Sequence, residues 1–251
     1  MFFSKNCIGC GVCGTICPNG AHTPFKGHTF DREKCTACGR CAAYCPTKAL
    51  EFCGRETSIE EILAAVERDR AFYGANGGVT VSGGEPFLQG GGTLALLKAC
   101  KERGISTAVE TCGYADSEIL LSAVPYVDLF LWDVKDTDAA RHTHYTGVSN
   151  ERILDNLQRI ADARARIRLR CILVQGVNTD DQHYANVAEI ASRIRNLEGV
   201  ELLPYHAYGG AKATFIGAVD NGRADWIPTP SACERARQKI EERGVVVMER
   251  A

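Results

Sequence analysis

Two copies of one cysteine spacing fill the first 45 residues of this 251-residue chain. Each copy reads Cys-x2-Cys-x2-Cys-x3-Cys-Pro. A [4Fe–4S] cluster needs four thiolates, and in this spacing three come from one tight loop while the fourth comes from the other copy. Structural zinc is the alternative, but zinc sites do not need four cysteines per copy in this spacing twice over. The pattern therefore predicts two crossed ligand sets: Cys7, Cys10, Cys13 and Cys45 for one cluster, and Cys35, Cys38, Cys41 and Cys17 for the other.

The remaining cysteines do not form a disulfide framework, because they are scattered singly along the chain as Cys53, Cys100, Cys112, Cys171 and Cys233. We therefore expect a reducing compartment, the cytoplasm. No secretory leader opens the sequence, and no apolar run approaches the ~20 residues that span a bilayer. The formal net charge of −2 gives no electrostatic reason to expect nucleic acid or an anionic membrane as the main partner.

Residues 1–54 form the predicted iron–sulfur module, and residues 55–251 are long enough for one further globular domain. That part alternates helix-like and strand-like segments, which favours parallel βα units in an α/β fold. A capping box, Ser58-x-x-Glu61, predicts the start of its first helix. The other expected helices span 93–103, 116–123, 150–163, 179–197 and 231–243. The expected strands span 79–81, 106–111, 128–134, 167–174, 200–204 and 245–248. An open or closed β/α barrel is the predicted architecture, with a doubly wound sheet as the alternative.

Polar residues follow or end five of these strands. They are Ser82-Gly83-Gly84-Glu85, Glu110-Thr111-Cys112, Asp133 with Lys135, Arg170, and His206. Each one alone has an ordinary explanation, such as a glycine turn, a solvated ion pair or a half-exposed edge strand carrying Arg166, Arg168 and Arg170. In a barrel, however, the carboxyl ends of the strands meet at one mouth. Together these residues would form a site for a zwitterionic ligand of the size of an adenosine derivative.

Several of these motifs stand in an order that resembles a known family. The matching segments are Phe72-Tyr73, 77–86, 110–114, 133–135, 146–150 and 202–206. They are similar to those of the glycyl-radical-enzyme activating enzymes, which are radical S-adenosylmethionine (SAM) proteins and include the pyruvate formate-lyase activase. The resemblance implies a partial (β/α)6 barrel of radical SAM type behind a ferredoxin-like module with two [4Fe–4S] clusters.

The same resemblance implies roles for the strand-end residues. Ser82, Gly83, Gly84 and Glu85 would bind the methionyl amino group of SAM, and Asp133, Lys135, Arg170 and His206 would contact the rest of it. Glu110, Thr111 and Asp133 would form a monovalent-cation site. The implied reaction is the reductive cleavage of SAM to a 5'-deoxyadenosyl radical, which removes hydrogen from a glycine of a partner glycyl radical enzyme under anaerobic conditions. A flavodoxin or a ferredoxin-type protein would supply the electron.

The sequence departs from the family pattern at the cluster that binds SAM. The family holds this third [4Fe–4S] cluster with Cys-x3-Cys-x2-Cys after its first barrel strand, and neither that motif nor that strand is found in this chain. A gene start placed too far downstream, or a fragment, would explain the difference. Gln175 also stands where relatives place proline. Two interpretations follow: an activating enzyme whose chain lacks the catalytic cluster loop, or a two-cluster electron-transfer or SAM-binding protein without radical chemistry. The strand-end residues favour the first interpretation.

Overall fold

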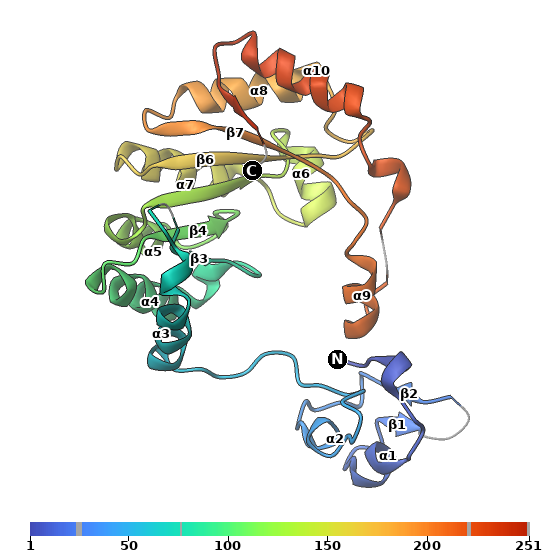
Figure 1. Cartoon of the computed structure of the whole chain (residues 1–251). Coiled ribbons are helices and arrows are strands. Elements are labelled where there is room, and N and C mark those ends of the chain that lie inside the picture. The colour runs from blue at the N-terminus through green and yellow to red at the C-terminus, as the bar shows by residue number, and fades with distance from the viewer. Residues whose placement is uncertain (24–26, 76, 220–221, 250–251) are drawn as a thin grey trace. The chain divides into compact units, whose positions relative to one another are not determined.

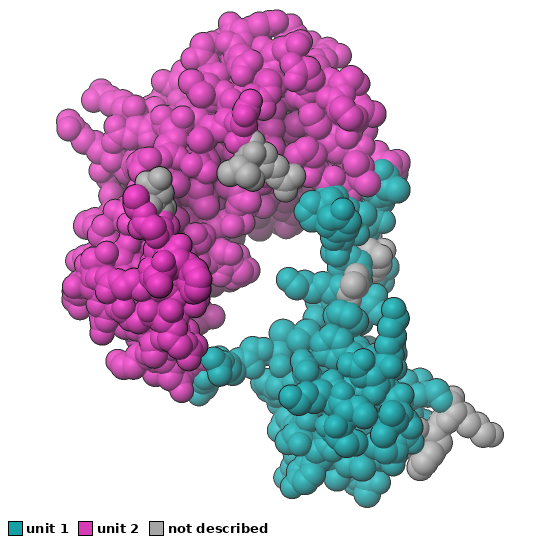
Figure 2. All heavy atoms as spheres, viewed as in Figure 1, with its two compact units in different colours: residues 1–56, 206–224 teal, residues 57–205, 225–251 magenta. Residues whose placement is uncertain are grey.

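The computed structural model describes residues 1–23, 27–75, 77–219 and 222–249. They form two compact units, coloured separately in Figure 2. The first unit contains residues 1–56 and 206–224, and the second contains residues 57–205 and 225–251. Residues 206–224 thus join the cysteine-rich unit, although the sequence analysis placed them in the 55–251 domain. A boundary drawn from composition divides a chain once, so it cannot anticipate a segment that returns to an earlier unit.

The first unit is built from short elements. They are η1 (Ser4–Asn6), α1 (Val12–Ile16), β1 (His22–Thr23), β2 (Thr29–Phe30), α2 (Arg40–Ala43) and α9 (Gly210–Ile216). Helices α1 and α2 each begin after a glycine with positive φ, Gly11 at 81° and Gly39 at 74°. Helix α9 joins this unit through Phe215, whose carbonyl accepts a 2.8 Å hydrogen bond from Arg32 and whose ring lies 4.5 Å from that of Phe3.

The second unit contains six parallel strands that follow one another across the sheet in chain order. They are β3 (Val79–Val81), β4 (Thr107–Thr111), β5 (Leu129–Val134), β6 (Ile167–Leu173), β7 (Leu197–Pro204) and β8 (Val247–Met248). A doubly wound sheet reverses its strand order at a switch point. The uninterrupted order instead agrees with the expected β/α barrel type. Within the described residues, β3 pairs with β4 alone.

The helices of the second unit lie mainly along one face of this sheet (Figure 1). They are α3 (Ile59–Arg68), α4 (Gly90–Glu102), α5 (Ser117–Ala123), α6 (Ala139–Thr146), α7 (Glu151–Asp162), α8 (Asp181–Ser192) and α10 (Pro230–Glu241), with single 3-10 turns η2 (Arg70–Phe72), η3 (Pro86–Gln89), η4 (Val124–Tyr126) and η5 (Ala224–Trp226). Their buried side chains, such as Leu97, Leu120 and Leu157, share one hydrophobic core with Phe130 and Trp132 of the sheet. No helix in the described part of the chain is both long and apolar enough to cross a bilayer.

Strand β6 shows how the sheet separates its two faces. Ile167, Leu169, Cys171 and Leu173 are buried, whereas the alternate residues between them are only partly buried. The strand pairs with β5 on one side and β7 on the other. The edge-strand explanation for its arginines is therefore wrong, because an interior strand has two partners. Its arginines lie on the sheet face opposite the packed aliphatic side chains.

Most element boundaries agree with the sequence prediction to within a few residues. The capping box is confirmed, since the backbone N–H of Ser58 donates to Glu61 and that of Glu61 donates to the Ser58 hydroxyl, at 3.1 and 3.2 Å. The predicted helix 179–197 is too long, because α8 ends at Ser192 and the chain enters β7 at Leu197. Helices α6 and α9 were not predicted; their short sequences, rich in His, Thr and Ala, carry little apolar periodicity.

Candidate functional site

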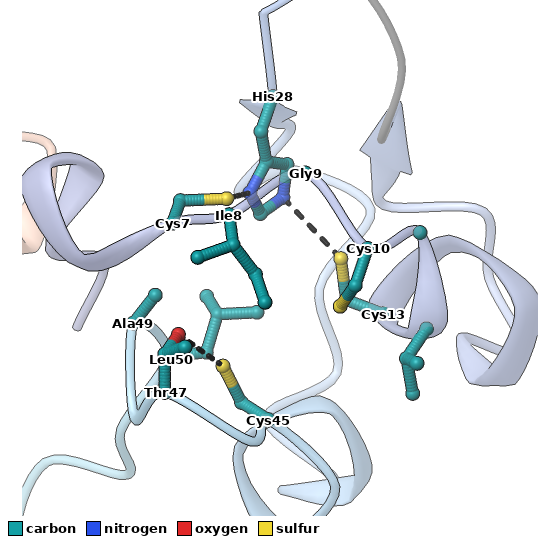
Figure 3. Close-up of a pocket in the computed structure, with 12 residues that line it drawn as sticks. Cys7, Ile8, Gly9, Cys10, Cys13, His28, Cys45, Thr47, Ala49 and Leu50 are labelled. Atoms are coloured by element: carbon teal, nitrogen blue, oxygen red, sulfur yellow. Dashed lines mark hydrogen bonds between the residues drawn. The ribbon is translucent and has the colours of Figure 1, made fainter.

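The cysteines of the first unit lie around two hollows. The first, shown in Figure 3, has a volume of about 360 Å³ and is lined by Cys7, Cys10, Cys13 and Cys45. The second has a volume of about 300 Å³ and is lined by Cys17, Cys35, Cys38 and Cys41. Each hollow thus takes three cysteines from one repeat and one from the other. We call them the first and the second cysteine pocket.

Both cysteine pockets have the chemistry of an iron–sulfur site. In the second cysteine pocket, backbone N–H groups of Ala21 and Ala37 donate to the sulfurs of Cys17 and Cys35, at 3.3 and 3.4 Å. Such donors stabilise the negative charge that thiolate-bound clusters carry. Four thiols around each hollow fit a four-iron cube, which takes four thiolate ligands.

Two histidines that the sequence analysis did not single out also line the cysteine pockets. His28 lies in the first, between the sulfurs of Cys7 and Cys13, and His22 lines the second. Burial lowers the pKa of both imidazoles. Their position between the two cysteine repeats was the available signal, but a lone histidine is too common in turns to stand out from sequence.

Glu85 joins the turn after β3 to the end of β4. Its carboxylate accepts hydrogen bonds from the Thr111 hydroxyl at 2.7 Å and from the Cys112 backbone N–H at 2.9 Å. The Cys112 thiol donates to the same carboxylate at 3.1 Å. Burial, together with the neighbouring Glu85 carboxylate, raises the pKa of Cys112. The carboxylate therefore holds two strand ends together.

The turn itself is open. Ser82, Gly83 and Gly84 are exposed, and the two glycines adopt positive φ values of 86° and 60°. A Cβ added at either glycine would meet no atom within 4 Å, so steric crowding does not explain the glycines. The left-handed backbone conformation explains them, because residues with a side chain adopt it only with strain. The exposed backbone of the turn is left available to a ligand.

Arg170 stands at the centre of a cluster of charges on β4, β5, β6 and β7. Its guanidinium lies 2.5 Å from the Glu110 carboxylate, 3.5 Å from that of Asp133 and 3.7 Å from that of Glu201. Burial opposes the charge of Arg170, but these carboxylates raise its pKa overall. Asp133 also pairs with the exposed Lys135 at 2.6 Å. The structure thus brings together five charged side chains, three acidic and two basic.

His206 is not grouped with these strand-end residues. It belongs to the first unit, where it is exposed and its ring lies 4.6 Å from that of Tyr208. The sequence analysis placed it with the other site residues because it follows the strand at 200–204. The chain changes units between Tyr205 and His206, and adjacency in sequence cannot reveal such a change.

A further hollow of about 540 Å³ opens beside Lys135. It is lined by polar groups from α6, by apolar groups from β6 and its following loop, and by Trp226 of η5; the first two sets include Thr146, Ile172 and Val174. The Trp226 ring packs edge-on against Tyr145 and Tyr205, at 5.8 and 5.7 Å. Trp226 and Tyr145 were not predicted as site residues, because their elements are far from the strand ends in sequence.

The strand ends of the second unit do not fit a third [4Fe–4S] cluster. Such a cluster needs at least three thiolates at one place. Cys112 is the one described cysteine at these strand ends, and its thiol is engaged with Glu85. Cys171 is fully buried, and burial raises its pKa to about 12.

Two family models match overlapping parts of the chain. Residues 34–188 match the radical SAM superfamily, and residues 6–49 match a 4Fe-4S dicluster domain. The choline trimethylamine-lyase activating enzyme of Oleidesulfovibrio alaskensis is 42% identical over 86% of this chain and 73% of its own length. The trans-4-hydroxy-L-proline dehydratase activating enzyme of Clostridioides difficile is 37% identical over 96% of this chain and 81% of its own.

Solved structures agree with this assignment. A domain of the pyruvate-formate lyase-activating enzyme from Bacteroides vulgatus is 30% identical and superposes with a TM-score of 0.58, covering 69% of this chain and 99% of that one. The relatives share activation of a partner enzyme as their named role, and the superfamily match covers more than half of the chain. The chain belongs to the radical SAM activating enzymes of glycyl radical enzymes.

Proposed function

We propose that this protein binds SAM at the strand ends of its second unit and two [4Fe–4S] clusters in its first unit, and that it acts on a glycyl radical enzyme. In radical SAM activating enzymes a third [4Fe–4S] cluster would supply the electron that cleaves SAM to a 5'-deoxyadenosyl radical, and this radical would remove hydrogen from a glycine of that partner. The described strand ends of this chain do not supply the thiolates for that cluster, so the radical step needs a cluster-binding segment in addition to these residues. The observation that carries the proposal is the charge cluster around Arg170. A protein that only carries electrons has no use for five charged side chains clustered on neighbouring parallel strands.

The residues of this site complement a zwitterion. The carboxylate of SAM would meet the cationic groups of Arg170 and Lys135, and its ammonium would meet carboxylates and the exposed backbone carbonyls of residues 82–84. Glu85 is already bound to Thr111 and Cys112, so its contribution is to position the turn. The hollow beside Lys135 would receive the less polar part of the ligand.

The proposed cation site overlaps the arginine cluster. Glu110 and Asp133 both face the guanidinium of Arg170, and the Thr111 hydroxyl donates to Glu85. A monovalent cation between Glu110, Thr111 and Asp133 would therefore compete with Arg170 for the same carboxylates. A potassium dependence of SAM affinity that is lost in Asp133→Asn would support this site, and the same affinity with and without potassium would contradict it.

Iron analysis tests the two clusters. The anaerobically reconstituted chain should hold about eight irons and eight sulfides, because each cube contains four of each. Cys17→Ser should damage the cluster of the second cysteine pocket, although residue 17 belongs to the first repeat. Damage confined to the first cysteine pocket would contradict the crossed ligand sets. A zinc content near two, with no iron–sulfur charge-transfer absorbance, would contradict the clusters altogether.

A second candidate function is electron transfer or SAM binding without radical chemistry. The single thiol at the described strand ends favours it for this chain. The two functions differ in one measurement, made after a Cys-x3-Cys-x2-Cys segment has been added: an activating enzyme under strong reductant then converts SAM to 5'-deoxyadenosine, whereas a binding protein leaves SAM intact. A glycyl radical enzyme is the partner of the first function, and a flavodoxin or ferredoxin is its proposed electron donor.

A further inference from the structure

Two histidines form a bridge between the two cysteine pockets. Nδ1 of His22 lies 2.9 Å from Nε2 of His28, a hydrogen-bond distance. His22 lines the second cysteine pocket and His28 lines the first. Neither imidazole has a part in the SAM site, so their arrangement calls for a separate explanation.

The two rings are held in place by packing. His22 is 6% exposed, and its ring stacks on Phe30 with centroids 4.6 Å apart and planes 12° from parallel. The rings of His28 and Phe2 form an edge-to-face pair with centroids 4.4 Å apart. Rings fixed in this way can hold a directional hydrogen bond, because little conformational freedom is lost when the bond forms.

The partners of each nitrogen decide where its proton lies. Nδ1 of His28 is 3.5 Å from the Cys7 sulfur, and a dashed line in Figure 3 marks this contact. A thiolate that binds iron can only accept a hydrogen bond. In the tautomer that allows this hydrogen bond, Nδ1 of His28 carries the proton. Nε2 of the neutral ring is then an acceptor for the N–H of His22. Nε2 also lies 3.6 Å from the sulfur of Cys13, farther away than His22.

We propose that His28 donates a hydrogen bond to the Cys7 thiolate and thereby raises the reduction potential of the cluster in the first cysteine pocket, with His22 fixing the tautomer. The inference rests on the proposed assignment of the two clusters. A cluster becomes more negative when it takes an electron, and hydrogen bonds to its sulfurs stabilise that added charge. Among the described residues, the sulfur contacts of the second cysteine pocket come from backbone N–H groups. The two clusters are therefore unequal electron acceptors.

The test is a redox titration of the whole reconstituted chain, with each one-electron reduction followed by electron paramagnetic resonance. His28→Phe keeps a ring of similar size but removes the donor. His22→Phe removes the group that fixes the tautomer. His144→Phe is the matched control, since His144 is an exposed histidine of the second unit. To assign the steps, His28→Phe is repeated in a chain whose second cluster is removed by Cys35→Ala and Cys38→Ala.

We expect His28→Phe to lower the potential of the first-pocket cluster and to leave that of the other cluster unchanged. His22→Phe should shift the same step by a smaller amount, and His144→Phe should shift neither. His28→Gln, which keeps an N–H donor, should lie nearer to the wild type and gives a second measurement if the Phe variant loses iron. Unchanged potentials in His28→Phe and His28→Gln, or equal shifts of both clusters, would overturn the inference.

Metal analysis separates three outcomes: a role of His28 at the cluster, a single metal ion bound in place of that role, and a failure of the cluster assignment itself. Cys13, His22 and His28 bring three ligand atoms within 4.8 Å of one another, so a single metal ion is a competing occupant. One zinc per chain that disappears in His28→Phe would overturn the inference. A wild-type chain without about eight irons would instead contradict the proposed function. Eight irons with insensitive potentials would contradict the role of His28 alone.

Discussion

Replacing Arg170 with alanine tests whether the charge cluster of the second unit recognises SAM. A charge-assisted hydrogen bond is typically worth about 1.5–3 kcal/mol. On that scale the loss of Arg170 should weaken SAM binding by about ten- to a hundredfold. Calorimetric titration of SAM into the chain, with cluster content matched between variants, measures this difference.

The structure adds a second consequence for the same substitution. The Arg170 side chain is 19% exposed and faces three carboxylates within 4 Å, those of Glu110, Asp133 and Glu201. Without the guanidinium, these like charges repel one another in a partly buried place. We expect the free energy of unfolding to fall by about 2–4 kcal/mol, near the lower end for a broken buried ion pair because the site retains some solvent. Denaturant unfolding measures this effect independently of SAM.

Arg168→Ala is the control for both measurements. Arg168 lies two residues earlier on the same face of β6 and donates to a single carboxylate, Glu198, at 3.0 and 2.9 Å. Its loss should lower stability without changing SAM affinity. The same SAM affinity for the wild type and Arg170→Ala would refute the proposed site, whatever happens to stability. Equal losses of affinity in both arginine variants would indicate a general disturbance of the sheet.

Three further outcomes are expected. Burial lowers the pKa of His183 to about 4, from 6.5 in the unfolded chain, so the unfolded state binds a proton at a higher pH than the folded state does. The free energy of unfolding should therefore fall by up to about 3 kcal/mol as the pH decreases from 6.5 toward 4. Unfolding measured against pH should show a smaller acid loss in His183→Gln, and an identical profile would contradict this. Gly113→Ala should fail to fold or lower the free energy of unfolding by more than about 2 kcal/mol, because φ of Gly113 is 74° and the new Cβ would lie 1.9 Å from the Trp132 ring. A variant with unchanged thermal stability would show that the ring can move. This chain should form no 5'-deoxyadenosine from SAM above the background of free clusters. A hybrid carrying the Cys-x3-Cys-x2-Cys segment of a relative ahead of Met1 should form it. Turnover by the unaltered chain would reveal a cluster site that the cysteine spacing does not indicate.

Much of the fold could be predicted because its elements are set by local patterns. Strand-like apolar runs predicted the strands, and the 3.6-residue apolar period predicted the longer helices. The capping box at Ser58 depends on two residues only three positions apart. Short elements escaped prediction. Helix α6 contains seven polar or small residues in its sequence AARHTHYT and buries His142, so its packing rather than its pattern forms the helix.

The site was foreseen less completely than the fold. The sequence alone indicated that Glu85, Glu110, Asp133, Lys135 and Arg170 follow or end neighbouring parallel strands, and parallel strands bring their carboxyl ends to one edge of a sheet. It could not assign partners within that set. That Arg170 faces Glu110, and that Glu85 binds Thr111 and Cys112, depends on strand register and side-chain direction.

The sequence by itself determined the cysteine repeats, the α/β class and the family, because these reside in residue types and spacings along the chain. Only the tertiary structure decided that residues 206–224, with His206, join the first unit, and that His22 and His28 bridge the cysteine pockets. Residues 206–224 join the first unit through contacts between segments far apart in the chain, such as that of Arg32 with Phe215, and the two histidines meet because the chain folds back between β1 and β2. Such contacts depend on how whole elements pack, and no local spacing of residues specifies them.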